Sequence, residues 1–210
     1  MSASRRETAA TLRERILSPA RTRLDPLAYA EAYRQRTVDI VNRLALAPVA
    51  ELIEILRVAL DERRHVFVCG NGGSAATASH FAAGLGKEGS RGRPTKFRVM
   101  SLTDNVPWIT SLANDADYSA VFVEQLENFA EVDDILIAFT GSGNSPNVVR
   151  AIEWGNANGL ATVGVTGRPG GRVGRLAQHV ISVDSPHMGH LEEAHFLIQH
   201  LVSYYFEDSE

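Results

Sequence analysis

Residues 65–74 read HVFVCGNGGS and residues 135–145 read ILIAFTGSGNS, so each stretch joins a short apolar run to a loop rich in glycine and serine. Glycine lets the backbone turn sharply and approach a ligand closely. Both loops lead into segments with helical patterns, so their hydroxyl groups fall near the free N–H groups of a helix N-terminus, where anions bind. The pair predicts a phosphorylated small molecule held between two loops.

Five apolar runs of β type predict an α/β fold. Most of them are separated by helical patterns, which favours a parallel sheet covered by helices on both faces. Ligands of such sheets bind beyond the carboxyl ends of the strands, where both loops fall. We expect strands over residues 65–69, 97–102, 135–139, 161–165 and 179–183, preceded by amphipathic helices over residues 26–46 and 48–62.

The composition is that of a single soluble globular domain with an N-terminal arm. The chain has 210 residues, of which 44% are hydrophobic and 22% are charged, and its net charge of −4 gives no signature of nucleic-acid binding. Residues 1–25 mix arginines with acidic residues and are expected to form a flexible or helical arm, whereas residues 26–210 form the domain. No run of about 20 apolar residues predicts a membrane span, so we expect a cytoplasmic protein.

The single cysteine, Cys69, excludes an intrachain disulfide and a cysteine-based zinc finger. It closes the apolar run of the first predicted strand. We therefore expect a buried, inert thiol.

The second loop carries the donors of a phosphate site. Ser145 is a candidate N-cap, and Pro146 suits the first position of a helix because it needs no amide partner there. The hydroxyls of Thr140, Ser142 and Ser145 are candidate donors to phosphate oxygens, with the backbone of Gly141 nearby. An ordinary serine-capped turn remains the alternative.

The first loop also permits a dinucleotide interpretation. Gly70, Gly72 and Ala75 fit the pattern G-x-G-x-x-G/A, which expects an acidic residue about 20 positions further on. The acid that follows the second predicted strand is Asp104, which lies too far along the chain. The fingerprint also leaves the second loop unexplained, so we favour the phosphate interpretation.

Four histidines, at positions 187, 190, 195 and 200, accompany Glu192 and Glu193 near the C-terminus. Imidazoles with a carboxylate can bind a divalent metal or transfer protons near neutral pH. Their spacing matches no standard zinc motif. A capped helix with surface histidines is the alternative.

Taken together, these motifs resemble those of sugar isomerase (SIS) domain proteins, and among them the phosphoheptose isomerases. The resemblance covers residues 30–206 and rests on Gly70–Ser74, His80–Ala83, Asn114–Asp115, Gly143–Asn147 and Glu193–His200. It implies a three-layer α/β/α sandwich with a five-stranded parallel sheet in flavodoxin-like order. It also implies N-terminal helices that assemble a homotetramer, with active sites shared between subunits.

The resemblance assigns roles to individual residues. Thr140, Gly141, Ser142 and Ser145 would bind the phosphate of a sugar phosphate. The sugar would contact the segment Asn71, Gly72, Gly73 and Ser74, together with Asp104. A divalent metal, zinc in the isomerases, would be held by His80, Glu192 and His200, which would also be the catalytic residues, with His200 transferring protons.

One position departs from the isomerase pattern. The family has a glutamate on the helix after the first loop, and here that position is Gly84, which offers neither a ligand nor an acid. Glu192 stands where the family has a glutamine. Two functions therefore remain open: an aldose/ketose isomerase, and a non-catalytic SIS module that binds a phosphosugar or a protein partner as a regulator.

Overall fold

The computed structural model describes residues 24–209. The chain divides into two compact units, Met1–Arg36 and Thr37–Glu210, and their boundary falls within helix α2 (Pro26–Asn42). The arm expected over residues 1–25 lies outside the described residues except for its last two positions. All the strands and predicted site residues belong to the second unit.

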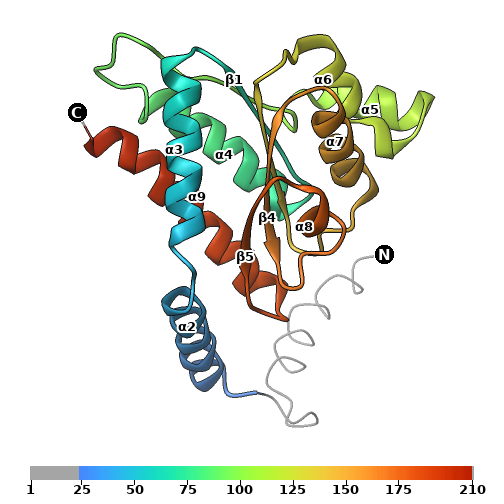
Figure 1. Ribbon diagram of the computed structural model, residues 1–210. Coiled ribbons are helices and arrows are strands. Elements are labelled where there is room, and N and C mark those ends of the chain that lie inside the picture. Colours follow the sequence, from blue (N-terminus) through green and yellow to red (C-terminus); the bar gives the residue numbers. More distant parts are fainter. Residues whose placement is uncertain (1–23, 210) are drawn as a thin grey trace, which may run out of the picture. The chain divides into compact units, whose positions relative to one another are not determined.

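The second unit is built on a five-stranded parallel sheet with the order β2-β1-β3-β4-β5 (Figure 1). The strands are β1 (His65–Cys69), β2 (Arg98–Ser101), β3 (Ile135–Thr140), β4 (Ala161–Gly167) and β5 (His179–Val183). This order places β1 beside β3 although some 60 residues separate them in sequence. The loops that follow these two strands therefore leave the same edge of the sheet side by side.

Helices cover both faces of the sheet, as Figure 1 shows. One face carries α3 (Ala47–Asp61), α4 (Gly73–Lys87) and α9 (Met188–Asp208). The other carries α5 (Val106–Asp115), the 3-10 turn η1 (Tyr118–Ala120), α6 (Val123–Phe129), α7 (Pro146–Ala157) and α8 (Val173–Leu176). No described helix is long and apolar enough to cross a bilayer.

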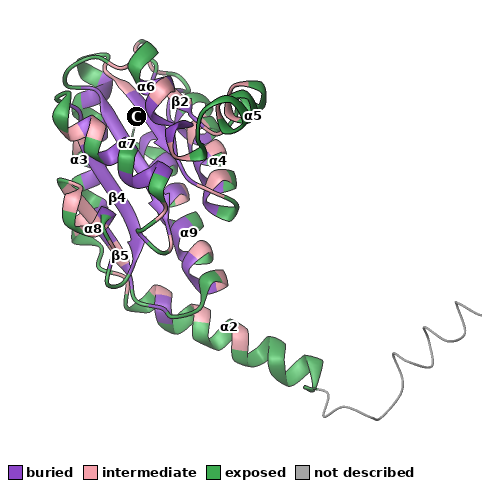
Figure 2. Cartoon of the chain, turned by 90° about the vertical axis from the view of Figure 1, so that its right-hand side faces the viewer, coloured by how far each residue is buried: buried purple, intermediate pink, exposed green. Residues whose placement is uncertain are grey.

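Alternation along the strands creates two cores. Val66 and Val68 pack under α3, α4 and α9, whereas Phe67 and Cys69 pack under the opposite layer. Figure 2 shows the strands as a buried layer between exposed helix surfaces. The expected burial of Cys69 is confirmed, and burial raises the pKa of its thiol to about 12, which disfavours the reactive thiolate.

The predicted α/β/α fold and its five strands are confirmed with small differences in boundaries. The second strand is Arg98–Ser101, one residue shorter at each end than expected, and the fourth extends to Gly167. Helix α2 ends at Asn42, four residues before its predicted end, and α3 begins one residue before Pro48. The N–H groups of a first helical turn have no partner within the helix, and proline lacks an N–H. Pro48 therefore suits the start of α3.

Helix α9 carries a buried polar stripe toward the sheet and α4. His195, Gln199 and Ser203, spaced four residues apart, are 1%, 0% and 1% exposed. Their side-chain nitrogen and oxygen atoms lack hydrogen-bond partners among the described residues. Burial lowers the pKa of His195 to about 4, although the nearby backbone of Thr166 acts in the opposite direction. The imidazole of His195 is therefore neutral at pH 7.

This neutral imidazole makes stability depend on pH. Below its ordinary pKa of 6.5 the unfolded chain takes up a proton at His195, while the folded chain does not until about pH 4. We therefore expect the free energy of unfolding to fall by about 3 kcal/mol from this group as the pH drops from 6.5 to 4. Urea unfolding at several pH values should show a shallower decline in His195→Leu than in the wild type. Equal slopes would contradict a neutral, buried His195.

Candidate functional site

The two loops predicted to bind phosphate line one cavity of about 270 Å³ at the carboxyl edge of the sheet. Helix α9 closes it with Met188 and Glu192, and Phe139 of β3 forms part of the wall. Eight of the nine residues predicted to contact the substrate line this cavity: Asn71, Gly72, Gly73, Ser74, Thr140, Gly141, Ser142 and Ser145. The structure thus brings both loops together around a space of the size of a small ligand.

The second loop orients its own hydroxyl groups. Thr140 Oγ1 accepts a hydrogen bond from the Gly143 N–H at 3.1 Å, and Ser142 Oγ accepts one from the Asn144 N–H at 3.2 Å. Because each oxygen accepts from the loop, its O–H remains available to donate. Ser145 occupies the predicted N-cap position of α7, but its side chain makes no capping hydrogen bond and lines the cavity instead.

A third segment fixes this loop from behind. The Gly167 N–H donates to the Gly141 carbonyl at 3.1 Å, and the Val173 N–H donates to the Gly143 carbonyl at 2.9 Å. Gly143 has a φ of +64°, and a Cβ there would overlap the carbonyl oxygen of Gly170. Only glycine therefore fits at residue 143 without a shift of the backbone.

Glu192 brings a carboxylate into the cavity beside the first loop. A Cβ on Gly73, the first residue of α4, would overlap the carboxylate oxygens of Glu192. The carboxylate thus lies at the N-terminal end of α4, where the helix dipole favours negative charge. The absence of a side chain on Gly73 creates the space that Glu192 occupies.

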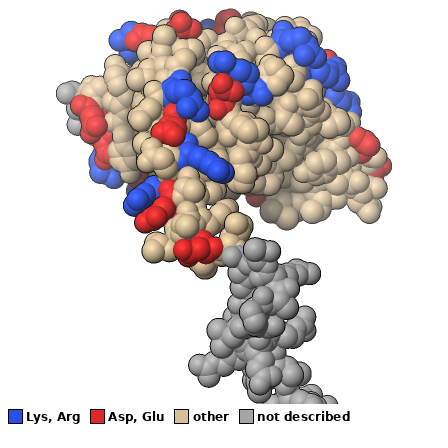
Figure 3. All heavy atoms as spheres, turned by 90° about the horizontal axis from the view of Figure 1, so that it is seen from below, with Lys and Arg blue, Asp and Glu red and all other residues tan. Residues whose placement is uncertain are grey.

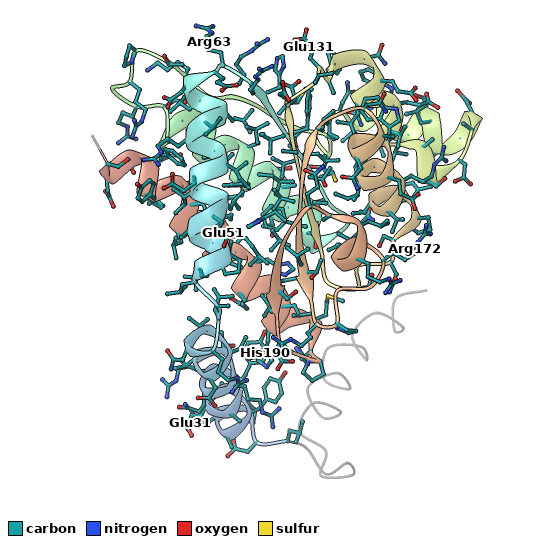
Figure 4. All side chains as sticks on the ribbon, in the orientation of Figure 1. Glu31, Glu51, Arg63, Glu131, Arg172 and His190 are labelled. Atoms are coloured by element: carbon teal, nitrogen blue, oxygen red, sulfur yellow. The ribbon has the colours of Figure 1, made fainter. Side chains whose placement is uncertain are left out.

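No Lys or Arg is among the described residues that line the cavity. Arg172, labelled in Figure 4, is paired with Glu153 of α7 at 2.6 Å. On the face that Figure 3 shows, basic and acidic side chains are interspersed around a broad uncharged area. An anion in this cavity would therefore rely on hydroxyl and backbone N–H donors.

The two histidines predicted to bind metal contact each other outside this cavity. His80 Nε2 and His200 Nε2 are 3.0 Å apart, and the ring of Phe196 packs 4.8 Å from His80 and 4.7 Å from His200 between ring centroids. Desolvation, with a smaller contribution from the charge of His80, lowers the pKa of His200. The ring of His200 therefore favours the neutral state that binds a metal.

Glu192 does not join this pair within one chain. It lies eight residues before His200 on α9. Eight residues separate the two positions by about 12 Å along the helix axis and by roughly 80° of rotation around it. The described residues contain no group of three or more His, Cys, Asp or Glu side chains placed to hold a metal ion. One chain thus supplies two imidazole nitrogens at one place and a carboxylate at another.

Helix α9 also fills the space beside Gly84, where the resemblance expects a glutamate. A Cβ on Gly84 would lie 2.7 Å from Ser203 Oγ and 3.8 Å from Gln199 Oε1. The close approach of α4 and α9 at this point depends on glycine. A larger side chain at residue 84 would require Ser203 to move.

Asp104 is the one predicted substrate contact that the structure does not place in the loop cavity. It accepts a short hydrogen bond from Ser79 and lines a separate cavity of about 560 Å³ between α4, β2 and α5. The cavity lies between the loops that follow β1 and β3. Strand β2 is the edge strand on the other side of β1, so the loop that follows it begins one strand away from the cavity.

Sequence reasoning missed two residues next to the cavity, Asn147 and Tyr118. Their side chains hydrogen-bond the side chain of Asn71 in the first loop. Asn147 lies within the segment Gly143–Asn147 on which the family resemblance rests, so the sequence did indicate that this position belongs to the site. No sequence pattern indicates Tyr118, which lies in a turn after α5.

The close approach of Gly143 to Gly170 predicts the effect of one added methyl group. We expect Gly143→Ala to lower the free energy of unfolding by about 2 kcal/mol, because the backbone must shift and a left-handed φ is strained in alanine. Gly174→Ala is the matched control, since its Cβ would lie 3.6 Å from the Pro169 carbonyl oxygen in ordinary contact. Chemical denaturation measures both, and equal stability of the two variants would contradict the packing described here.

Comparison with known proteins agrees with this architecture. The SIS domain model matches residues 28–167. A phosphoheptose isomerase of Akkermansia muciniphila is 35% identical over 178 residues, covering 82% of this chain and 94% of that protein. One of Mycobacterium tuberculosis is 35% identical over 179 residues, covering 85% and 91%.

The solved structure of a phosphoheptose isomerase from Francisella tularensis superimposes with a TM-score of 0.79 at 26% identity, covering 89% of this chain and 100% of that one. These sequence and structural similarities extend over most of the chain. The chain therefore belongs to the SIS domain family, in its phosphoheptose isomerase-like branch.

Proposed function

We propose that this protein is a sugar-phosphate isomerase that interconverts sedoheptulose 7-phosphate and the corresponding aldose phosphate. The observation that carries the proposal is the cavity in which both loops meet a single carboxylate, Glu192. Relatives named phosphoheptose isomerase, at 35% identity over most of their length, support the same substrate class.

The second loop would hold the phosphate. Thr140 and Ser142 each accept a hydrogen bond from a backbone N–H of their own loop, which leaves their O–H groups available to donate, and Ser145 makes no capping hydrogen bond. Three hydroxyl donors at the N-terminal end of α7 suit a phosphate dianion, which accepts hydrogen bonds at three oxygens. The carbon chain of the sugar would then extend toward the first loop and Glu192.

Glu192 would move the proton that isomerisation requires. An aldose and a ketose differ in which of two adjacent carbons carries the carbonyl. A base must therefore remove a proton from one carbon and return it to the other, while a second proton passes from the hydroxyl oxygen to the carbonyl oxygen. The carboxylate of Glu192 lies in the cavity and can perform both transfers. The first loop would hold the sugar hydroxyls in place meanwhile.

We further propose that His80 and His200 join the site by assembly of a homotetramer. His80 of α4 contacts His200 beside an exposed apolar part of α9, where Phe196, Leu201 and Tyr204 are 37%, 38% and 47% exposed. Such surfaces mark contacts with other subunits. His200 of one subunit would then act as a second proton-transfer group at the cavity of another.

A divalent metal, expected from the resemblance to be zinc, requires the same assembly. The two imidazole nitrogens of one chain are too few for a stable zinc site, which uses three or four protein ligands. A carboxylate such as Glu192 from a neighbouring subunit would complete the set. The proton transfer by Glu192 described above does not depend on this metal.

Turnover of sedoheptulose 7-phosphate tests the proposed reaction. Proton NMR in D₂O should show the aldose phosphate accumulating, with deuterium entering the carbon that receives the transferred proton. Tight binding of the sugar phosphate without turnover, with the metal supplied, would instead favour the regulatory SIS module.

Glu192→Gln keeps the size of the side chain and removes the base. We expect kcat to fall by about 10²–10⁴-fold with little change in KM, because the carboxylate acts in the transition state and not in binding. Glu193→Gln, which alters the next, exposed residue of α9, is the matched control and should retain normal turnover. Equal activity of the two variants would remove Glu192 from the mechanism.

Light scattering and metal analysis test the assembly. We expect a tetramer at micromolar concentration, with bound metal that is lost in His80→Ala. A stable monomer with full turnover would contradict the shared site.

A further inference from the structure

Two loops that bind one ligand must be held at a fixed separation, and the structure contains a specific link between them. Asn71 of the first loop donates from Nδ2 to Asn147 Oδ1 at 2.9 Å, and Asn147 donates from Nδ2 to Asn71 Oδ1 at 2.8 Å. Asn147 belongs to the first turn of α7, directly after the second loop, and is 1% exposed. The reciprocal amide pair therefore joins the two loops from the buried side.

The orientation of both carboxamides follows from a backbone donor. The Val148 N–H donates to Asn147 Oδ1 at 3.0 Å, which identifies that atom as the oxygen. Asn147 Nδ2 must then donate, and the atom of Asn71 that it meets must be the oxygen. The donor and the acceptor of each hydrogen bond between the two side chains are thus determined.

Tyr118 adds a third element to the link. Its hydroxyl donates to Asn71 Oδ1 at 3.1 Å from the turn η1. The neighbouring Ser119 accepts a hydrogen bond from Arg150 of α7 at 2.6 Å, which ties the same turn to α7. Asn71 is therefore held from two directions.

These bonds use most of the hydrogen-bonding capacity of Asn71. Its oxygen accepts from both Asn147 and Tyr118, which occupies both lone pairs, and one of its two N–H groups is donated to Asn147. One N–H remains for a ligand. The side chain of Asn71 thus serves mainly to hold the loop, and the contacts to a sugar fall to the neighbouring residues of that loop.

We propose that Asn147 and Tyr118, neither of which lines the cavity, are positioning residues that set the distance between the two ligand-binding loops through Asn71. This inference rests on the proposed function, since it concerns the same cavity. A displacement of about 1 Å between bound groups can reduce turnover by about 10²-fold. Loss of the link therefore affects binding and turnover together, although no atom that touches the ligand is removed.

Asn147→Leu tests the proposal by removing the link while keeping the volume of the side chain. We expect KM for sedoheptulose 7-phosphate to rise by about tenfold and kcat to fall by up to about 10²-fold. Asn156→Leu is the matched control on the same helix. Asn156 is partly buried, and its side chain hydrogen-bonds the Leu176 carbonyl and the Thr162 hydroxyl, away from the cavity. We expect kinetic constants within about threefold of the wild type in this control.

Tyr118→Phe removes a single hydroxyl from an exposed residue and keeps the test valid if Asn147→Leu does not fold. We expect KM to rise by about three- to tenfold, in line with the loss of one hydrogen bond. Wild-type kinetic constants in this variant, or equal effects of Asn147→Leu and Asn156→Leu, would overturn the proposal.

Hydrogen exchange separates this proposal from the proposed function. If the wild-type protein does not turn over the sugar phosphate, the proposed function fails, but the link is still measurable. We expect the backbone amides of residues 70–74 to exchange faster in Asn147→Leu and Tyr118→Phe than in the wild type and in Asn156→Leu. Unchanged exchange in both variants would show that the amide pair does not hold the loop.

Discussion

The parallel pairing of β1 with β3 is the constraint on which the rest of the site depends. Val66 pairs with Ile135 and Cys69 pairs with Ala138, so β3 ends two residues beyond the end of β1 at the same edge of the sheet. Because parallel strands point the same way, the loops after them must emerge together. The apolar runs of both strands, buried on both faces, stabilise this register, and the cavity that both loops line is its direct result.

Much of this arrangement could be predicted from the sequence. The glycine- and serine-rich loops follow continuous apolar runs, a pattern typical of buried parallel strands, and eight predicted contacts do line one cavity. The metal prediction is a different case, because it depended on side-chain placement. In the structure Glu192 lies at the loop cavity, whereas His200, eight residues further along α9, contacts His80.

What the sequence could not provide were contacts that depend on tertiary packing. The position of Asp104 depends on which strand lies at the edge of the sheet, and no local pattern states that. Tyr118 reaches Asn71 only because a turn after α5 folds against α7. The closure of the space beside Gly84 likewise depends on how closely α9 approaches α4, which the residue types alone do not determine.

The hydrogen bonds behind the second loop have a thermodynamic consequence. The backbone of residues 141–143 is fixed by residues 167 and 173 before any ligand arrives. A loop that is already ordered loses little conformational entropy on association, so most of the interaction enthalpy with an anion contributes to affinity. Preorganisation of this kind would help the proposed phosphate site, whose described wall residues offer neutral donors and include no lysine or arginine.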